Sequence, residues 1–121
     1  MQAAHLILFV EDQARSRDFY QVVLARKPRL DVPGMTEFVL LDGAVLGLMP
    51  TRSARRLQLP TGKGGSELYL VVPETAQMVA RAVEAGATVV NPLGWRDWGA
   101  QVAYLQDPDG HLLALADRVV G

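Results

Sequence analysis

Residues 105–118, LQDPDGHLLALADR, join a sharp turn to an aliphatic run. Asp-Pro-Asp-Gly at 107–110 is typical of a turn between two strands. The segment AQVAYLQ (100–106) precedes the turn and Leu112–Ala116 follows it, so we predict a hairpin here. A strand that takes part in catalysis is expected to carry a polar group, and every side chain of Leu112–Ala116 is aliphatic.

This run has a counterpart in the first half of the chain. DGHLLALAD (109–117) matches DGAVLGLMP (42–50), and both segments begin with an Asp-Gly pair. ELYLVV (67–72) matches HLILFV (5–10), and the two matches occur in the same order along the chain. Matches in the same order favour an internal duplication, in which each copy is a strand, a helix and three further strands.

Hydrophobic spacing predicts one helix in each copy. The first, 12–26, begins at the N-cap Asp12 and ends at Lys27-Pro28, because proline disfavours helical geometry in the residue before it. Its apolar face comprises Phe19, Tyr20, Val23 and Leu24. The second, 73–86, ends at Gly86, and its apolar face comprises Val79, Ala82 and Val83.

The other apolar segments predict strands on either side of one long connection. A short strand is expected at 29–32, a hairpin at 37–49 and a strand at 87–92, and the extra length of the second copy is assigned to PLGWRDWG (92–99). The polar segment 50–65 is expected to be the connection. We therefore expect one domain over 1–121, with module one at 1–50, a linker at 51–65 and module two at 66–121.

Composition excludes several classes of protein. The chain has 121 residues, a formal net charge of −1 and no cysteine, which excludes disulfides, thiolate nucleophiles and cysteine-based metal sites. A near-neutral charge argues against binding to nucleic acid. The apolar runs are shorter than a membrane span, and the N-terminus lacks the pattern of a signal peptide. We expect a cytoplasmic protein that does not bind a membrane.

In its order and spacing of motifs the chain resembles the vicinal oxygen chelate superfamily, which includes glyoxalase I, bleomycin-resistance proteins and extradiol dioxygenases. The resemblance rests on HLILFVEDQARSRDFYQVVLA (5–25), AVEAGATVVNP (82–92) and WGAQVAYLQDPDGHLLAL (98–115). It implies an α+β fold of two βαβββ modules in one chain, with strands curled into an open barrel around a cavity. It also implies a homodimer with cavities at the subunit interface.

The resemblance also identifies four positions at which metal-dependent relatives carry ligands. They lie at the start of the first strand and in the last strand of each module, and here they are His5, Gly47, Glu67 and Ala114. Imidazole and carboxylate bind zinc, nickel, iron or manganese, but glycine and alanine have no ligating side chain. A catalytic zinc site usually has three protein ligands. We therefore expect no cofactor, with a divalent metal at His5 and Glu67 as the alternative.

Alternation along the strands predicts which side chains line the cavity. With both tryptophans added from the resemblance, the predicted ligand-binding residues are His5, Phe9, Met49, Glu67, Tyr69, Trp95 and Trp98. Aromatic faces favour flat or cationic ligands; Trp98 either contacts the ligand or closes the barrel end by packing. No catalytic residue is identified, because no serine lies in a Gly-x-Ser-x-Gly segment.

Other polar residues are weaker candidates for the functional site. A basic group in the connection, Arg52, Arg55, Arg56 and Lys63, either recognises an anionic group of a substrate or is a solvated loop. His111 either lines the cavity or is a solvated residue of the turn. Glu37 could face the cavity, but it has no counterpart in the relatives. The sequence therefore predicts a protein that binds a small aromatic or antibiotic-like molecule in a mostly apolar cavity, without a complete catalytic metal site. The alternative is a metal-dependent lyase or isomerase, resembling lactoylglutathione lyase, or a dioxygenase, using His5 and Glu67.

Overall fold

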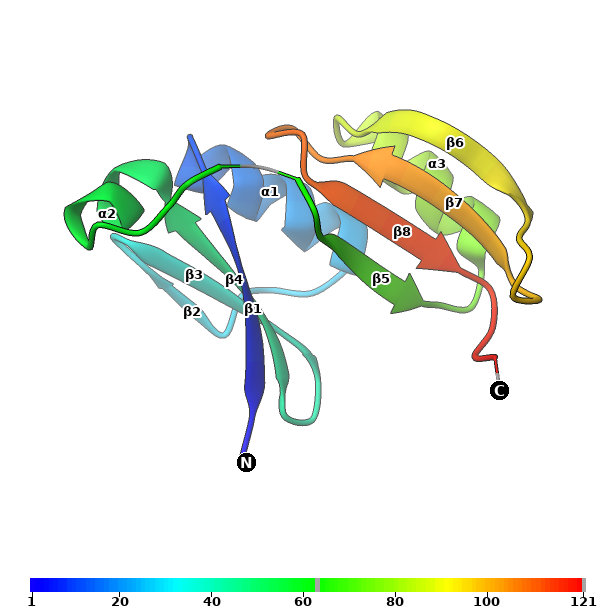
Figure 1. Ribbon diagram of the computed structural model, residues 1–121, viewed down its shortest axis with the longest axis horizontal. Helices are drawn as coiled ribbons and strands as arrows, with labels where there is room; N and C mark the ends of the chain where they lie inside the picture. Colours follow the sequence, from blue (N-terminus) through cyan, green and yellow to red (C-terminus); the bar gives the residue numbers. More distant parts are fainter. Residues whose placement is uncertain (63, 121) are drawn as a thin grey trace. The chain divides into compact units, whose positions relative to one another are not determined.

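The computed structural model describes residues 1–62 and 64–120, and the chain divides into two compact units, Met1–Gly62 and Lys63–Gly121. Each unit contains one four-stranded sheet (Figure 1). Unit one comprises β1 (Ala4–Val10), α1 (Gln13–Leu24), β2 (Leu30–Val32), β3 (Met35–Leu41), β4 (Ala44–Pro50) and α2 (Thr51–Arg56). Unit two comprises β5 (Glu67–Val71), α3 (Thr75–Glu84), β6 (Thr88–Trp95), β7 (Gln101–Gln106) and β8 (Leu112–Ala116).

The two sheets have the same topology. Their strand orders are β1-β4-β3-β2 and β5-β8-β7-β6. In each sheet the first strand of the unit pairs in parallel with the last, and the remaining pairs are antiparallel. The predicted α+β class and the repeated βαβββ module are therefore confirmed.

Helix α1 covers one face of the unit-one sheet, where it packs against β3 and β4. Its predicted apolar face is buried, with Ser16 added to it. Asp12 is the N-cap as predicted, because its carboxylate accepts a hydrogen bond of 3.0 Å from the Arg15 backbone N–H. The helix ends at Leu24, earlier than predicted, because Ala25 turns to a left-handed conformation with φ of 52°. The C-terminus is thus set by this turn and not by Pro28.

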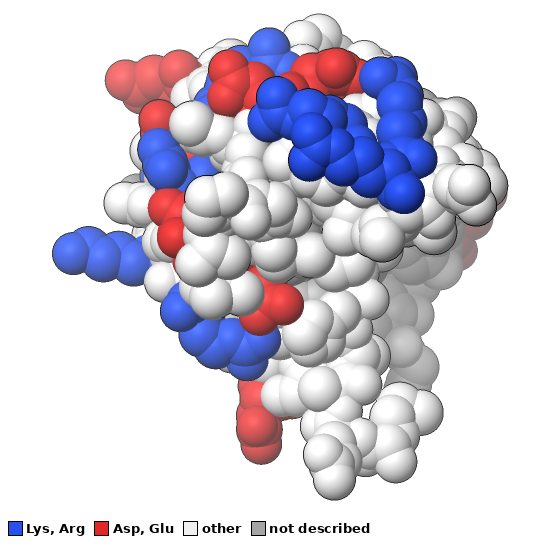
Figure 2. All heavy atoms as spheres, turned by 90° about the vertical axis from the view of Figure 1, so that its left-hand side faces the viewer, with Lys and Arg blue, Asp and Glu red and all other residues white. Residues whose placement is uncertain are grey.

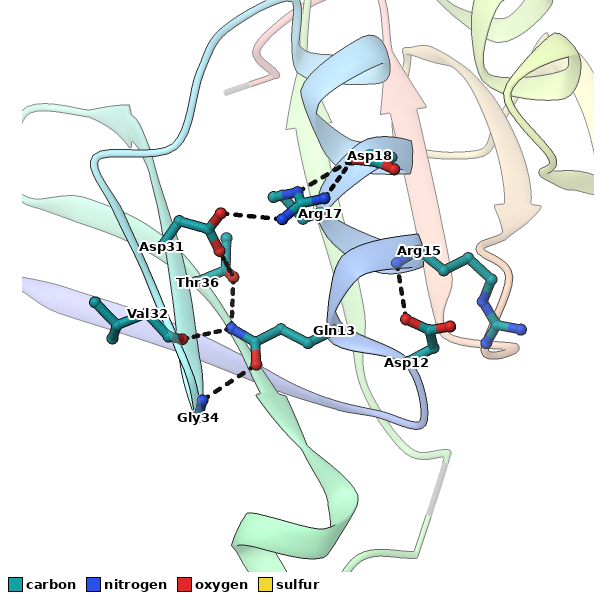
Figure 3. A network of polar contacts seen from close by, with 9 residues as sticks. All are labelled: Asp12, Gln13, Arg15, Arg17, Asp18, Asp31, Val32, Gly34 and Thr36. Carbon is teal, nitrogen blue, oxygen red and sulfur yellow. Dashed lines mark hydrogen bonds and ion pairs between the residues drawn. The ribbon is translucent and has the colours of Figure 1, made fainter.

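A polar network holds the start of α1 to the turn between β2 and β3 (Figure 3). The Gln13 amide donates to the Val32 carbonyl and the Thr36 hydroxyl, both at 2.8 Å, and accepts from the Gly34 N–H at 3.1 Å. Thr36 in turn donates to Asp31 at 2.8 Å. A pocket of about 280 Å³ lies beside the network. Because these polar groups satisfy one another, we assign the network to stability.

The segment predicted to connect the two modules contains a helix, α2, that the sequence did not predict. Helix α2 begins directly after β4 and packs against β4 and β1. Thr51 and Ala54 are its buried residues, and they lie three positions apart on one face. Arginine and alanine are good helix formers, and this small apolar face is sufficient to dock the segment on the sheet.

In unit two, α3 packs against β8 and β6. Its buried residues are Thr75, Met78 and Ala82. The predicted apolar face was therefore partly wrong, since Val83 is exposed and Met78 is buried in its place. Thr75 and Met78 form the stripe with Ala82, whereas Val83 points about 100° away from it. No helix in the described parts of the chain has the length and apolar character needed to cross a membrane.

Strand β6 extends to Trp95 and so takes in half of the segment predicted to be an insert. It is an edge strand, which tolerates Pro92, and its pairing with β7 shifts register between Val89 and Asn91 and between Asn91 and Gly94. Arg96 holds this irregular segment, because its guanidinium donates to the Pro92 carbonyl at 2.7 Å and the Val102 carbonyl at 2.8 Å.

The two predicted hairpins are present but differ in length. Asp42-Gly43 alone joins β3 to β4, whereas residues 107–111 join β7 to β8. In the longer turn, Asp107 Oδ1 accepts hydrogen bonds of 2.9 Å from the backbone N–H groups of Asp109 and His111. Asp107 and Asp109 therefore act in the turn, as predicted.

Candidate ligand-binding pocket

The strand register of unit two places three positions side by side. Tyr69 on β5 pairs with Ala114 on β8, and Ala114 pairs on its other side with Tyr104 on β7. Paired residues share a face of a sheet, so the methyl group of Ala114 lies between two tyrosines. Ala114 is fully buried, in a cluster with Ala100, Val102 and Ala116 against which Tyr104 packs. The position at which relatives carry a metal-binding carboxylate is thus filled here by a small, buried alanine packed among its neighbours.

A pocket of about 340 Å³ lies beside this row. Its lining residues are Tyr69, Val71, Trp98, Arg118, Val119 and Val120. The Trp98 Nε1–H donates a hydrogen bond of 3.1 Å to the Tyr69 hydroxyl, which joins the two aromatic side chains of the wall. The structure therefore brings two of the predicted ligand-binding residues, Tyr69 and Trp98, into one concave surface.

The segment after β8 supplies half of the lining, and sequence reasoning missed its role. Arg118, Val119 and Val120 follow the strand directly. Asp117 fixes the start of the segment, since its N–H donates to the Gln101 carbonyl at 3.0 Å and its carboxylate accepts from the Gln101 N–H at 2.9 Å. The letters of 117–120, two charged residues followed by two valines, gave no local sign of this contact.

Trp95 does not line the pocket, but it contacts a residue that does. The Arg118 guanidinium lies 4.7 Å from the centre of the Trp95 ring, within the range of a cation–π interaction. The same guanidinium donates to Asp117 from Nε at 3.0 Å and from Nη2 at 2.7 Å. Trp95 and Asp117 together therefore hold Arg118 at the pocket wall.

These contacts predict the titration of Asp117. The Arg118 guanidinium, helped by the Gln101 N–H, lowers the pKa of Asp117 from 3.8 to about 2, while partial burial opposes the shift. Because the folded-state pKa lies below the unfolded value, this stabilisation is present above pH 3.8 and is lost as the pH falls toward 2. We expect the Asp117 carboxyl carbon to titrate near pH 2 in NMR spectra, and Arg118→Gln to return the midpoint toward 3.8. An Asp117 midpoint near 3.8 in the parent protein would contradict the ion pair.

Tyr104, whose face the sequence left open, lies on the same face as Tyr69. The Arg96 guanidinium is 5.4 Å from the centre of its ring. Burial raises the pKa of the Tyr104 hydroxyl, and the negative charge of Glu67 raises it further, while Arg96 lowers it. Tyr104 is therefore a neutral hydrogen-bonding group at ordinary pH.

In unit one, His5 has a partner that the sequence did not identify. The imidazole Nδ1 lies 3.5 Å from Glu37 Oε2, and Arg29 Nη2 lies 2.5 Å from Glu37 Oε1. Glu37 reaches the face of His5 because it pairs with Gly47, which pairs with Ile7 on β1. Phe9 and Met49 are paired on that same face and are half-buried. The sequence analysis named Glu37 as a polar residue without a counterpart in the relatives, but it did not predict the pairing with His5.

At Gly47, the second position without a metal-ligating side chain, neighbouring side chains fill the space that a Cβ atom would need. A Cβ atom added there would overlap Ile7 Cδ1 and would lie 3.2 Å from Met35 Sδ. Glycine thus allows the Ile7 side chain to cross β4. Both positions without ligands are explained by adjacent bulky side chains.

The placement of the possible metal ligands bears on the alternative prediction of a divalent metal at His5 and Glu67. His5 and Glu67 lie in different units, and His5 is already paired with Glu37. Among residues 1–62 and 64–120, no group of three or more His, Cys, Asp or Glu side chains is placed to hold a metal ion. Neither unit by itself therefore supplies the three protein ligands of a catalytic zinc site among its described residues, and a metal at His5 and Glu67 stays a prediction.

The basic group of the connection lies on α2. Arg52, Arg55 and Arg56 are exposed, and Figure 2, which faces the side where α2 lies in Figure 1, shows basic side chains clustered at its top. Lys63, the fourth member, lies outside the described residues. None of the described pockets is lined by these arginines, so their role with an anionic group stays a prediction.

The fold and the pocket define a class: an α+β protein of two βαβββ modules with an aromatic pocket beside a parallel strand pair. A family model described as Glyoxalase/Bleomycin resistance protein/Dioxygenase superfamily matches residues 2–115. The chain belongs to this superfamily, which confirms the resemblance to vicinal oxygen chelate proteins.

Similar proteins agree with this assignment. An uncharacterized protein of Mycobacterium bovis is 31% identical over 122 aligned positions, which cover 93% of this chain and 80% of the relative. A glyoxalase-related enzyme from Fulvimarina pelagi has a similar structure, with a TM-score of 0.86, 24% identity, and coverage of 98% of this chain and 88% of that one. A glyoxalase/bleomycin resistance protein/dioxygenase family enzyme from Burkholderia phytofirmans PsJN has a TM-score of 0.84 at 18% identity, covering 95% and 97% of the two chains. These structures support the fold.

Proposed function

We propose that this protein binds a small, flat, largely apolar molecule in the pocket beside β5, without a complete catalytic metal site. The observation that carries the proposal is the joined aromatic wall of Tyr69 and Trp98 in a pocket of about 340 Å³. That volume lies at the small end of the range for small-molecule sites, and aromatic walls favour planar ligands. Three valines complete the lining and keep the pocket mostly apolar.

The polar residues of the wall orient a ligand and do not supply chemistry. The Trp98 N–H is used by the Tyr69 hydroxyl, whose own proton remains available to a ligand acceptor. His5 and Phe9 lie in unit one, and their contact with the same ligand stays a prediction. The homodimer implied by the resemblance and the cytoplasmic location expected from composition also stay predictions.

Calorimetric titration with three flat probes tests the proposal: neutral 2-naphthamide, anionic 2-naphthoate and cationic proflavine. We expect saturable binding of at least one probe, weakened about tenfold or more by Trp98→Ala because a stacking face is removed. Val71→Ala is expected to weaken binding about threefold, since one lining methyl pair is lost. The matched control is Val90→Ala, an exposed valine of β6 outside the pocket, which should leave the affinity unchanged. No saturable binding by the folded protein would contradict the proposal.

The second candidate, a metal-dependent lyase, isomerase or dioxygenase, rests on His5 and Glu67. Metal content after purification without chelators or a histidine tag separates it from the first. Stoichiometric bound zinc, nickel, iron or manganese that is lost in His5→Ala would favour this second function.

A further inference from the structure

Arg118 is the one lining residue of the pocket that carries a charge. No acidic residue lines the pocket with it, since the other lining residues are a tyrosine, a tryptophan and three valines. An apolar wall with a single cation favours a ligand that is apolar over most of its surface and negative at one end. The charge of the lining is therefore a source of selectivity distinct from its shape.

The guanidinium is held in place before any ligand binds. Its hydrogen bonds to Asp117 use Nε and Nη2, and the Trp95 ring lies against its face. Nη1 donates to no group among the described residues, and about half of the side chain is exposed. An arginine has five N–H donors, so donors remain for a ligand. The cost of ordering the side chain is already met by Asp117 and Trp95.

The segment that carries Arg118 lies beyond the part of the chain that matches the family. The family model ends at residue 115, while Asp117 ties the following residues to the start of β7. The position of Arg118 thus depends on a contact between Asp117, which follows the matched residues, and Gln101, which lies within them. This is where a selectivity particular to this chain can arise on a shared fold.

We propose that Arg118 determines the specificity of the pocket, so that it selects flat aromatic carboxylates over neutral analogues of the same shape. The inference rests on the proposed function and names its ligand class. The carboxylate accepts hydrogen bonds from the Nη1 side of Arg118, while the ring lies against Trp98 and Tyr69. Asp117 remains bonded to the opposite donors and moderates the charge, so the expected preference is about tenfold.

Calorimetry at pH 7 with 2-naphthoate and 2-naphthamide tests the inference, because the two probes share a ring and differ in charge. The parent protein should bind the acid about tenfold more tightly than the amide. Arg118→Gln should reduce this ratio to about twofold by weakening the acid alone, and Arg118→Lys should restore part of it. The matched control is Lys27→Gln, which removes the same charge from an exposed residue after α1 that lines neither described pocket and should leave the ratio unchanged.

The outcomes separate the inference from the function on which it rests. Equal binding of acid and amide by the parent overturns the inference and leaves the pocket as a site for flat molecules. An acid preference that survives in folded Arg118→Gln also overturns it, because the charge is then recognised elsewhere. If the folded protein binds none of the three probes, the acid, the amide or proflavine, the proposed function itself is overturned.

Discussion

Replacement of Ala114 by glutamate is expected to lower the free energy of unfolding by about 3 kcal/mol or more. Ala114 is fully buried and is flanked by Tyr69 and Tyr104 on the paired strands. A longer side chain must displace one of these rings, and its carboxylate is placed among apolar groups. Urea denaturation followed by circular dichroism measures the loss.

Two further variants separate charge from size. Ala114→Leu adds volume without charge and should cost about 1–3 kcal/mol. Gln106→Glu adds the same carboxylate at an exposed position of β7 and should change stability by less than about 0.5 kcal/mol. An Ala114→Glu protein as stable as the parent would show that the space between the tyrosines is open, and the metal alternative would gain support.

The second large effect is expected in the turn that precedes β8. Asp107→Ala should lower the free energy of unfolding by about 2–3 kcal/mol, because it removes an acceptor shared by two backbone N–H groups. Asp107 is buried, and its Oδ1 lies 2.9 Å from the backbone nitrogens of Asp109 and His111. Those N–H groups would be left without this acceptor. Thermal and urea denaturation measure the change.

The corresponding turn in unit one supplies the control. Asp42, in contrast to Asp107, is exposed, and among the described residues it has no buried side-chain hydrogen bond to lose. Asp42→Ala is therefore expected to change stability by less than about 0.5 kcal/mol. Equal losses in the two variants would mean that both aspartates act through turn propensity, and that the buried hydrogen bonds of Asp107 contribute nothing.

The absence of ligands at Gly47 and Ala114 has a common physical explanation. In unit one, glycine lets Ile7 cross the strand, and in unit two alanine fits between Tyr69 and Tyr104. In both modules a small residue on the last strand makes room for a larger side chain on the parallel first strand. The same duplicated position thus serves packing in both copies.

Local signals in the sequence were sufficient for much of the fold. The Asp12 cap and the buried face of α1 follow from side-chain chemistry within a few residues. The helix at Thr51–Arg56 was missed because only two of its residues are buried, which gives too weak a periodicity. Val83 was misplaced because alanine-rich helices have apolar residues on more than one face.

For the candidate site, alternation placed Tyr69 on the same face as Glu67, because every second residue of a strand shares a face, and the resemblance implied that Ala114 lies on that face too. The sequence by itself thus determined the repeat, the family and the missing ligands, all of which depend on short-range order. The tertiary structure alone decided that His5 pairs with Glu37 and that Arg118 joins Tyr69 and Trp98 in one pocket. Those contacts depend on strand register and on the path of the chain after β8, and they join residues too distant in the chain for local patterns to specify.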